Sequence, residues 1–230
     1  HLDHDPSRTS MTGWTSRAML NKQKGTTRLN TGLGLVSPGY EINDRGFQFR
    51  ADEINTHMAA GYKWTVPNRW VRTRVVDLTT YWTWDTGGTR NGGGYGVFGW
   101  TEFANYWSMS GHVFYNPAAD KTRTTRGGPL LREPAQREFD LQVSTDSRKP
   151  FTLDLNGGAG GSERGGHYGY GGLGFNLKPS SALQISLSPE IFWQQDRSQW
   201  VTSVDDEVMT STYGRRSIFS DLDYREISMS

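Results

Sequence analysis

Two pairs of neighbouring carboxylates, Asp52–Glu53 and Asp205–Asp206, are the residues whose chemistry would suit catalysis. Glycosidases place two carboxyl groups several ångströms apart, one acting as an acid and the other as a base or nucleophile. Side chains of adjacent residues on a strand point to opposite faces, so neither pair can form such a dyad by itself. We expect both pairs to be solvated or paired with basic side chains. The sequence therefore predicts no catalytic residue and no enzyme.

The histidines and the absence of cysteine limit the cofactors that this chain could hold. The five histidines, at positions 1, 4, 57, 112 and 167, lack the close spacing to carboxylates that a transition-metal site needs. With no cysteine in the chain, disulfides and thiolate sites are excluded. Asp196 and the run Asp205–Glu207 could attract calcium in a surface loop, which is the one alternative to the prediction of no cofactor.

Arginines and carboxylates of the longer loops form a more informative set. Guanidinium groups pair well with carboxylates in confined sites, where parallel hydrogen bonds fix the geometry. Inside a barrel such a network would order inward-folded loops, narrow the lumen and favour an anionic or sugar-like solute. The alternative is that these charges only anchor loops and solvate the wall. The set consists of Glu41, Asp44, Arg123, Arg126, Arg132, Asp146, Arg148, Arg215, Arg216, Asp221 and Asp223.

Residues 54–64 show the pattern that must position these side chains. Ile54, Met58 and Trp64 share one face of an extended strand, whereas Asn55 and Lys63 fall on the opposite face. The stretch is about ten residues long, roughly twice a typical globular strand and near the length that crosses a bilayer when tilted. The same alternation predicts strands at 11–20, 27–36, 71–84, 95–106, 107–115, 139–145, 151–156, 167–177 and 182–193, with shorter pieces at 200–204, 209–213 and 224–229.

The sequence thus predicts an all-β fold, a partial antiparallel transmembrane β-barrel of roughly 11–12 strands that forms a single domain over residues 1–230. Short turns alternate with long loops at 37–53, 85–94, 116–137 and 157–166, an asymmetry typical of outer-membrane barrels. Hydrophobic residues make up 34% of the chain and aromatic residues 13%, which suits a wall one residue thick. A soluble sandwich or propeller alternates in the same way and is the alternative.

Two sets of side chains would mark the membrane. The lipid-facing candidates are aliphatic residues on the apolar strand faces: Leu29, Leu33, Leu35, Met58, Leu183, Ile185 and Leu187. The candidates for an interfacial girdle are aromatic residues near strand ends: Tyr62, Trp64, Trp82, Trp84, Trp107 and Trp193. The facing of the strand at 95–106 stays open, because Val97 and Phe98 compete for the apolar side.

Five segments resemble, in the same order, segments of a family of Gram-negative outer-membrane proteins. They are Ser37–Phe47, Thr125–Leu130, Asp146–Phe151, Val201–Asp206 and Tyr213–Arg216. In that family a carbohydrate-binding-like module of the family 9 type precedes a C-terminal barrel of uncharacterised function. The resemblance implies that this chain is a fragment of such a barrel in the bacterial outer membrane, without the upstream module and without the first and last strands. It carries over no catalytic residue.

The expected function is that of a membrane anchor or channel-like scaffold for a surface carbohydrate-handling protein, with the lipid bilayer as its partner. Glycans could stack on aromatic residues of the loops, which could instead lie in the membrane interface: Tyr40, Phe47, Trp70 and Trp200. One alternative is a structural subunit in contact with other membrane-protein subunits, and another is a soluble β-rich glycan-active enzyme. The formal net charge of +1 argues against nucleic acid as a partner.

Overall fold

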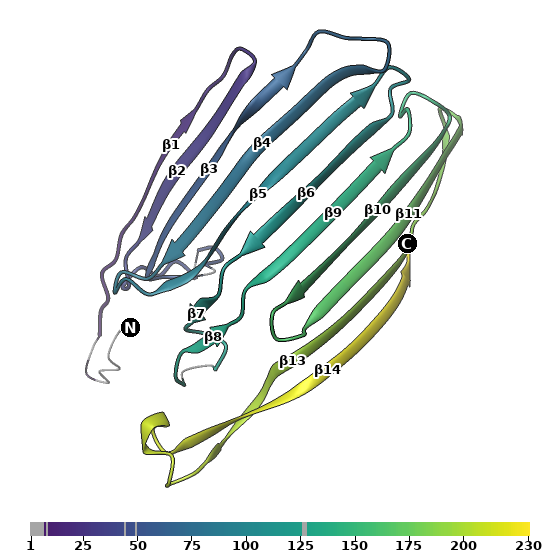
Figure 1. The fold of residues 1–230 in the computed structure, drawn as a ribbon. Coiled ribbons are helices and arrows are strands. Elements are labelled where there is room, and N and C mark those ends of the chain that lie inside the picture. Colours follow the sequence, from purple (N-terminus) through teal and green to yellow (C-terminus); the bar gives the residue numbers. More distant parts are fainter. Residues whose placement is uncertain (1–6, 8, 44, 49, 126–127) are drawn as a thin grey trace.

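The computed structural model describes residues 7, 9–43, 45–48, 50–125 and 128–230, and its main feature is one large antiparallel sheet (Figure 1). The sheet has twelve strands in the order β1-β2-β3-β4-β5-β6-β9-β10-β11-β13-β14, with β12 paired to β11 beside this path. β7 and β8 form a separate sheet of two strands. The strands are β1 (Thr15–Asn21), β2 (Thr27–Val36), β3 (Glu53–Trp64), β4 (Val71–Trp84), β5 (Arg90–Phe103), β6 (Ser108–Asn116), β7 (Ala119–Lys121), β8 (Leu131–Glu133), β9 (Gln136–Ser144), β10 (Phe151–Ser162), β11 (His167–Ser180), β12 (Leu183–Leu187), β13 (Pro189–Asp205) and β14 (Arg215–Met229).

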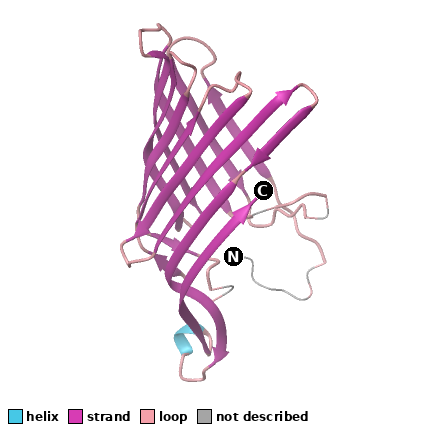
Figure 2. Ribbon diagram, turned by 90° about the vertical axis from the view of Figure 1, so that its right-hand side faces the viewer, coloured by secondary structure: helices cyan, strands magenta, loops and turns pink. Residues whose placement is uncertain are grey.

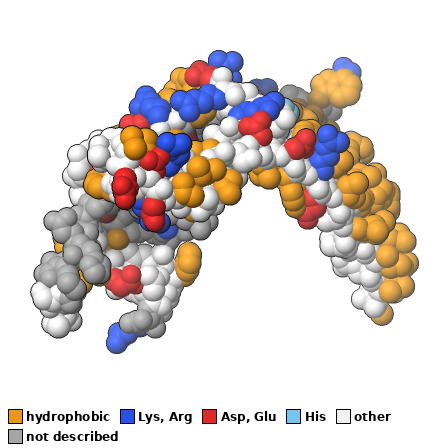
Figure 3. All heavy atoms as spheres, turned by 90° about the horizontal axis from the view of Figure 1, so that it is seen from below, with side chains coloured by type: hydrophobic (Ala, Val, Ile, Leu, Met, Phe, Trp, Pro, Cys, Tyr) orange, Lys and Arg blue, Asp and Glu red, His pale blue; other side chains and the backbone are white. Residues whose placement is uncertain are grey.

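The sheet curves into an arch and does not close. Figure 2 shows the tilted strands curving around one side, and Figure 3 shows the arch from its lower end. Within the described residues, the edge strands β1 and β14 pair with one neighbour each. The predicted antiparallel all-β fold is confirmed, whereas closure into a barrel is not seen in this chain.

Connections differ between the two ends of the sheet. At the upper end in Figure 1, which we term the turn end, short connections join β1 to β2, β3 to β4, β5 to β6 and β9 to β10. The lower end, which we term the loop end, carries the described parts of the segments 37–52 and 117–135. It also carries the tip of the β13–β14 hairpin with a short 3₁₀ helix, η1 (Thr210–Thr212). Long loops are present at two of the four predicted places, 37–53 and 116–137, whereas short turns join β4 to β5 and β10 to β11.

The strand registers separate two faces of the sheet, because residues directly opposite one another in antiparallel strands share a face. One row of such residues is apolar and lies on the face that we term outer: Leu29, Ala60, Leu78, Val97, Val113, Phe139 and Ala159. The adjacent row lies on the inner face and is mostly polar or glycine: Arg28, Gly61, Asp77, Phe98, His112, Asp140, Gly158 and Tyr170. Along the right-hand arm in Figure 3, hydrophobic side chains gather on the outer, convex side. The open facing at 95–106 is thereby resolved.

Two glycine-rich stretches that we predicted as loops are largely strands. β5 begins at Arg90, inside the predicted loop at 85–94, and β10 continues to Ser162 through the predicted loop at 157–166. Glycine usually weakens a strand, but here it leaves room for large side chains of the neighbouring strand. A Cβ on Gly160 would lie 2.3 Å from Cε1 of Tyr168. The glycines therefore belong to the packing of the sheet.

The predicted boundaries near both ends of the chain were also wrong in part. β1 begins at Thr15, whereas we predicted a strand from residue 11. β13 runs without a break through the predicted gap at 194–199, and residues 209–213 form a turn around η1 in place of a strand. The register of β13 and β14 shifts between Asp196 and Gln199 and again between Trp200 and Thr202. Such irregularities interrupt the alternation of side chains on which the prediction depended.

Candidate functional site

An ion pair on the inner face spans the middle one of three strands. Arg28 on β2 and Asp77 on β4 lie on either side of Gly61 on β3. Nε of Arg28 donates to both carboxylate oxygens of Asp77, at 3.0 and 3.1 Å. The Asp77 side chain is buried and that of Arg28 is half exposed. A Cβ on Gly61 would lie 2.2 Å from Oδ1 of Asp77, so glycine in the middle strand permits this pair.

A tyrosine on β11 forms a hydrogen bond with a carboxylate on β9, again across a glycine of the strand between them. The hydroxyl of Tyr170 donates to Oδ2 of Asp140 at 2.8 Å, across Gly158 on β10. Oδ1 of Asp140 also lies 3.3 Å from Nδ1 of His112 on β6. The Asp140 carboxylate thereby links side chains from three strands, β6, β9 and β11, across four neighbouring strands.

A second tyrosine pair lies nearer the loop end, where Tyr168 donates to Glu138 at 3.3 Å across Gly160. Our sequence reasoning missed both tyrosine pairs. The available signal was a glycine at every second position of one strand facing tyrosines at every second position of the next. Among the described residues, no group of three or more histidine and acidic side chains could hold a metal ion. The inner face is therefore a hydrogen-bonded polar surface.

The predicted lipid-facing residues share the outer face. On β2 and β3, the outward residues include Leu29, Leu33, Leu35 and Met58. Ile185 on β12 lies opposite Leu177 on β11, which in turn lies opposite the outward residue Phe151 on β10. Leu183 and Leu187 are each two positions from Ile185 along β12, so their side chains point to the same side. Leu33, Met58 and Ile185 are exposed, and Leu78 in the same rows is 64% exposed. The outer face is apolar and has no second layer within the described residues.

The predicted girdle residues on β3 and β4 form two groups at different levels. Tyr62 and Trp64 lie near the turn end with ring centroids 4.8 Å apart, and Trp82 and Trp84 lie near the loop end with centroids 6.4 Å apart. Trp107 lies in the turn before β6. The remaining candidate, Trp193 on β13, is paired with Gly169 on β11, and its indole ring packs over this glycine.

Charged side chains of the outer face lie beside the same aromatic groups. The guanidinium of Arg74 is 4.4 Å from the ring centroid of Trp64, and that of Arg90 is 5.6 Å from the ring centroid of Trp82. Between these two levels, the outward residues of β4 are uncharged: Val76, Leu78 and Thr80. On β4 this uncharged stretch, which we term the outer band, is thus bounded at both levels by tryptophan and arginine. On β14, the charged residues Asp223 and Arg225 share the outer face.

The predicted polar network does not form as one unit. Asp44 and Arg126 lie outside the described residues. Asp146 and Arg148 lie at the turn end, whereas Arg215 and Arg216 lie at the tip of the β13–β14 hairpin beyond the loop end. The other members also have local partners: Glu41 accepts from the backbone N of Asn43, Arg132 pairs with Asp120, Asp221 with Arg197, and Asp223 with Arg225. These side chains are local anchors, because the sheet separates its two ends by the length of the strands.

The pair at the turn end has the best geometry. Nε and Nη2 of Arg148 donate to the two carboxylate oxygens of Asp146 at 2.8 and 2.7 Å. The guanidinium also lies 3.2 Å from the ring centroid of Tyr106. The hydrogen bonds from Arg148 lower the pKa of Asp146 to about 2. This arrangement fixes the β9–β10 turn.

The neighbouring carboxylates Asp52–Glu53 and Asp205–Asp206 each have a partner close by. Burial acts to raise the pKa of Asp52, but hydrogen bonds from the Thr86 backbone N at 2.9 Å and its hydroxyl at 2.6 Å hold this pKa below its ordinary value. Glu53 lies 3.7 Å from Arg50. At the hairpin tip Asp205 lies 3.6 Å from Arg215, and Asp206 lies 2.6 Å from Arg216. All four carboxylates therefore have partners that hold the loops.

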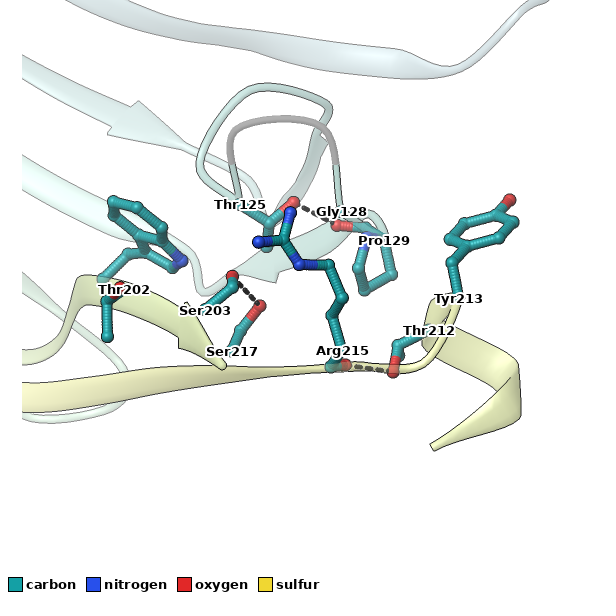
Figure 4. A pocket seen from close by; sticks show the side chains of 10 residues that line it. Thr125, Gly128, Pro129, Thr202, Ser203, Thr212, Tyr213, Arg215 and Ser217 are labelled. Atoms are coloured by element: carbon teal, nitrogen blue, oxygen red, sulfur yellow. Dashed lines mark hydrogen bonds between the residues drawn. The ribbon is translucent and has the colours of Figure 1, made fainter. Parts of the chain in front are cut away.

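Cavities lie at the loop end. One of about 280 Å³ is formed between the β13–β14 hairpin and the residues Thr125, Gly128 and Pro129 (Figure 4). In it the Arg215 side chain extends towards Thr125, and the hydroxyls of Ser203 and Ser217 are 3.4 Å apart. A second cavity of about 390 Å³ adjoins it at Trp200 and includes Arg123, which belonged to our predicted set. The volumes of both cavities suit a small ligand. Most of the lining is polar, which favours a polar ligand over an apolar one.

The model of a family described as Domain of unknown function (DUF5916) matches residues 3–226. The chain belongs to this family. No curated protein and no solved structure matches the chain. The DUF5916 assignment brings no reaction, and the outer-membrane barrel and the family 9 module stay predictions.

In this DUF5916 chain the inner-face carboxylates of Asp77, Glu138 and Asp140 are engaged by arginine, tyrosine or histidine. Its two carboxylate pairs lie where strands β3 and β13 meet their adjoining loops. The described part of the chain holds no helix with the length and hydropathy needed to span a bilayer.

Proposed function

We propose that this chain forms part of the wall of a transmembrane β-barrel in a bacterial outer membrane, where it serves as a membrane anchor or channel-like scaffold for a surface carbohydrate-handling protein. The observation that carries the proposal is the uncharged outer band of β4, which lies between two levels of tryptophan and arginine. A sheet in water must cover an apolar face with a second layer. Lipid can take the place of that layer.

The dimensions of the band support the proposal. From Arg74 to Trp84, β4 extends about 33 Å along its axis, or about 25 Å in height at the tilt of about 40° that is usual in such barrels. This height equals that of the apolar band of outer-membrane barrels, about 25 Å. Arginine beside tryptophan at each level fits the membrane interface, where both side chains have an apolar body and a polar end.

The inner face would then line a polar lumen. Its ion pair and tyrosine–carboxylate pairs are costly in lipid and stable beside water. Closing the lumen requires further strands that pair with the free edges of β1 and β14, because an exposed edge in lipid leaves backbone groups without hydrogen bonds.

The test exploits the absence of cysteine, since a single introduced cysteine can be spin-labelled directly. Labels on the outer face, at Leu33 and Ile185, should be relaxed by lipid-soluble oxygen and not by a water-soluble nickel chelate. Labels on the inner face, at Asn30 and Gln184, should respond to the chelate. The chain would be reconstituted in phosphatidylcholine vesicles for these measurements. Outer labels that respond to neither reagent would mean a dry protein core and would refute the membrane proposal.

A further inference from the structure

Three cavities at the loop end adjoin one another and form an elongated groove. The cavity of about 280 Å³ shares Trp200 with the cavity of about 390 Å³. The larger cavity shares Gln136 and Ser162 with a third, of about 120 Å³, which reaches Glu138 and Tyr168 on the inner face. We term this the loop-end groove. Its central part lies within the size range of ligand sites, about 300–1,000 Å³.

The lining of the groove indicates the chemistry of an occupant. The central cavity combines hydroxyl and amide groups with two carboxylates and three guanidinium groups: Ser162, Gln136, Glu133, Asp196, Arg123, Arg164 and Arg197. Such a mixture can donate to and accept from many hydroxyl groups at once. Its apolar side chains are few, with Trp200 the largest of them. A peptide or lipid with apolar side chains would find little to pack against.

Two arginines are placed to receive negative charge. Arg164 lies in the exposed turn between β10 and β11, and it has no hydrogen bond or ion pair with another described residue. Arg215 pairs with Asp205 through Nε at 3.6 Å, which is longer than a hydrogen bond, and its guanidinium extends into the outer cavity, where it can bind a second carboxylate (Figure 4). Arg197, in contrast, already pairs with Asp221 at 2.8 Å. Arginine forks match carboxylates through two parallel hydrogen bonds.

We propose that the loop-end groove binds an acidic oligosaccharide, whose carboxylates pair with Arg164 and Arg215 and one of whose rings stacks on Trp200. An oligomer fits a row of adjoining cavities better than a single sugar does. The sugar hydroxyls meet the amides, hydroxyls and carboxylates of the central cavity, and the flat apolar side of a pyranose ring meets the indole. The proposal goes beyond the membrane function and does not depend on it, because every residue in it lies beyond the outer band.

The experiment is calorimetric titration of the full chain in detergent micelles with hexagalacturonate. Neutral maltohexaose and hexaglutamate serve as the comparison ligands. Hexagalacturonate should bind, and maltohexaose should bind at least tenfold more weakly. Arg164→Gln should weaken binding by about tenfold, because one charge-assisted contact is lost. Trp200→Ala should weaken it by a similar factor.

Matched controls lie at the turn end, where Arg69 is stacked over Trp70 at 4.4 Å and both are remote from the groove. Arg69→Gln and Trp70→Ala should leave the affinity unchanged. Absence of hexagalacturonate binding, or equal losses in the control variants, would overturn the proposal. Hexaglutamate that binds as tightly as hexagalacturonate would show an acidic-peptide site and would also overturn it. Should Trp200→Ala fail to refold, Arg164→Gln decides alone, since its turn is exposed. Failure here would leave the spin-label result for the outer face unaffected.

Discussion

Replacing Gly61 with alanine tests whether the glycine on β3 is required by the ion pair that crosses it. The new Cβ would lie 2.1 Å from the carbonyl oxygen of Val76 and 2.2 Å from Oδ1 of Asp77. The carbonyl belongs to the backbone of β4 and cannot rotate away, so the two strands must separate or the sheet must bend. The Arg28–Asp77 pair, with distances of 3.0 and 3.1 Å, would be disturbed at the same time.

The expected loss of stability follows from these contacts. Overpacking costs about 1–3 kcal/mol. Weakening the ion pair adds about 1 kcal/mol, a value reduced because Arg28 is half exposed and screened by water. Reduced freedom of the unfolded chain offsets about 0.5 kcal/mol. We expect Gly61→Ala to lower the free energy of unfolding by about 2–3 kcal/mol.

Gly99→Ala is the matched control, because a Cβ at Gly99 on the next strand but one would meet nothing within 4 Å. It should be neutral or stabilising by about 0.5 kcal/mol. Urea unfolding followed by tryptophan fluorescence would measure both variants, and Gly61→Ala should lower the midpoint by about 1 M. Equal midpoints for the two variants would refute the steric argument.

Two further predictions concern the turn end and the outer face. Because the pKa of Asp146 is held at about 2, the stability that its pairing with Arg148 contributes is present above the ordinary carboxyl pKa and is lost as the pH falls from about 4 towards 2. Arg148→Gln should therefore flatten the pH dependence of the urea midpoint in this range, and an unchanged acid limb would contradict this. Leu78→Arg on the outer face should cost about 2–4 kcal/mol in vesicles, whereas Thr79→Arg on the inner face should be tolerated; similar losses measured by urea titration would count against a lipid-facing surface.

The strands with regular alternation could be predicted from the sequence, because a period of two determines which side chains share a face. Residues 54–64 became β3 with the expected facing, and the aliphatic residues assigned to the lipid side all fell on the outer face. This part of the prediction depends only on local spacing.

The site could not be predicted in the same way, because its contacts depend on register between distant segments. Arg28 and Asp77 are 49 positions apart, and nothing near either residue identifies the other as its partner. The glycines at 157–161 were predicted as a loop because glycine is a local turn signal, whereas Gly158 and Gly160 accommodate the rings of tyrosines on β11. The loop arginines were grouped by residue type, although the sheet holds Arg148 and Arg215 at opposite ends.

The polar pairs that cross a middle strand have a consequence for how the sheet assembles. A slip of one residue would turn every side chain of a strand to the other face, and a contact such as Arg28–Asp77 forms only when β2, β3 and β4 are all in register. Pairing of β2 with β3 alone does not form the Arg28–Asp77 contact, which forms only after β4 has paired with β3. Assembly should therefore advance in cooperative groups of three strands. In pulsed hydrogen exchange during refolding, the backbone amides of all three strands should gain protection together.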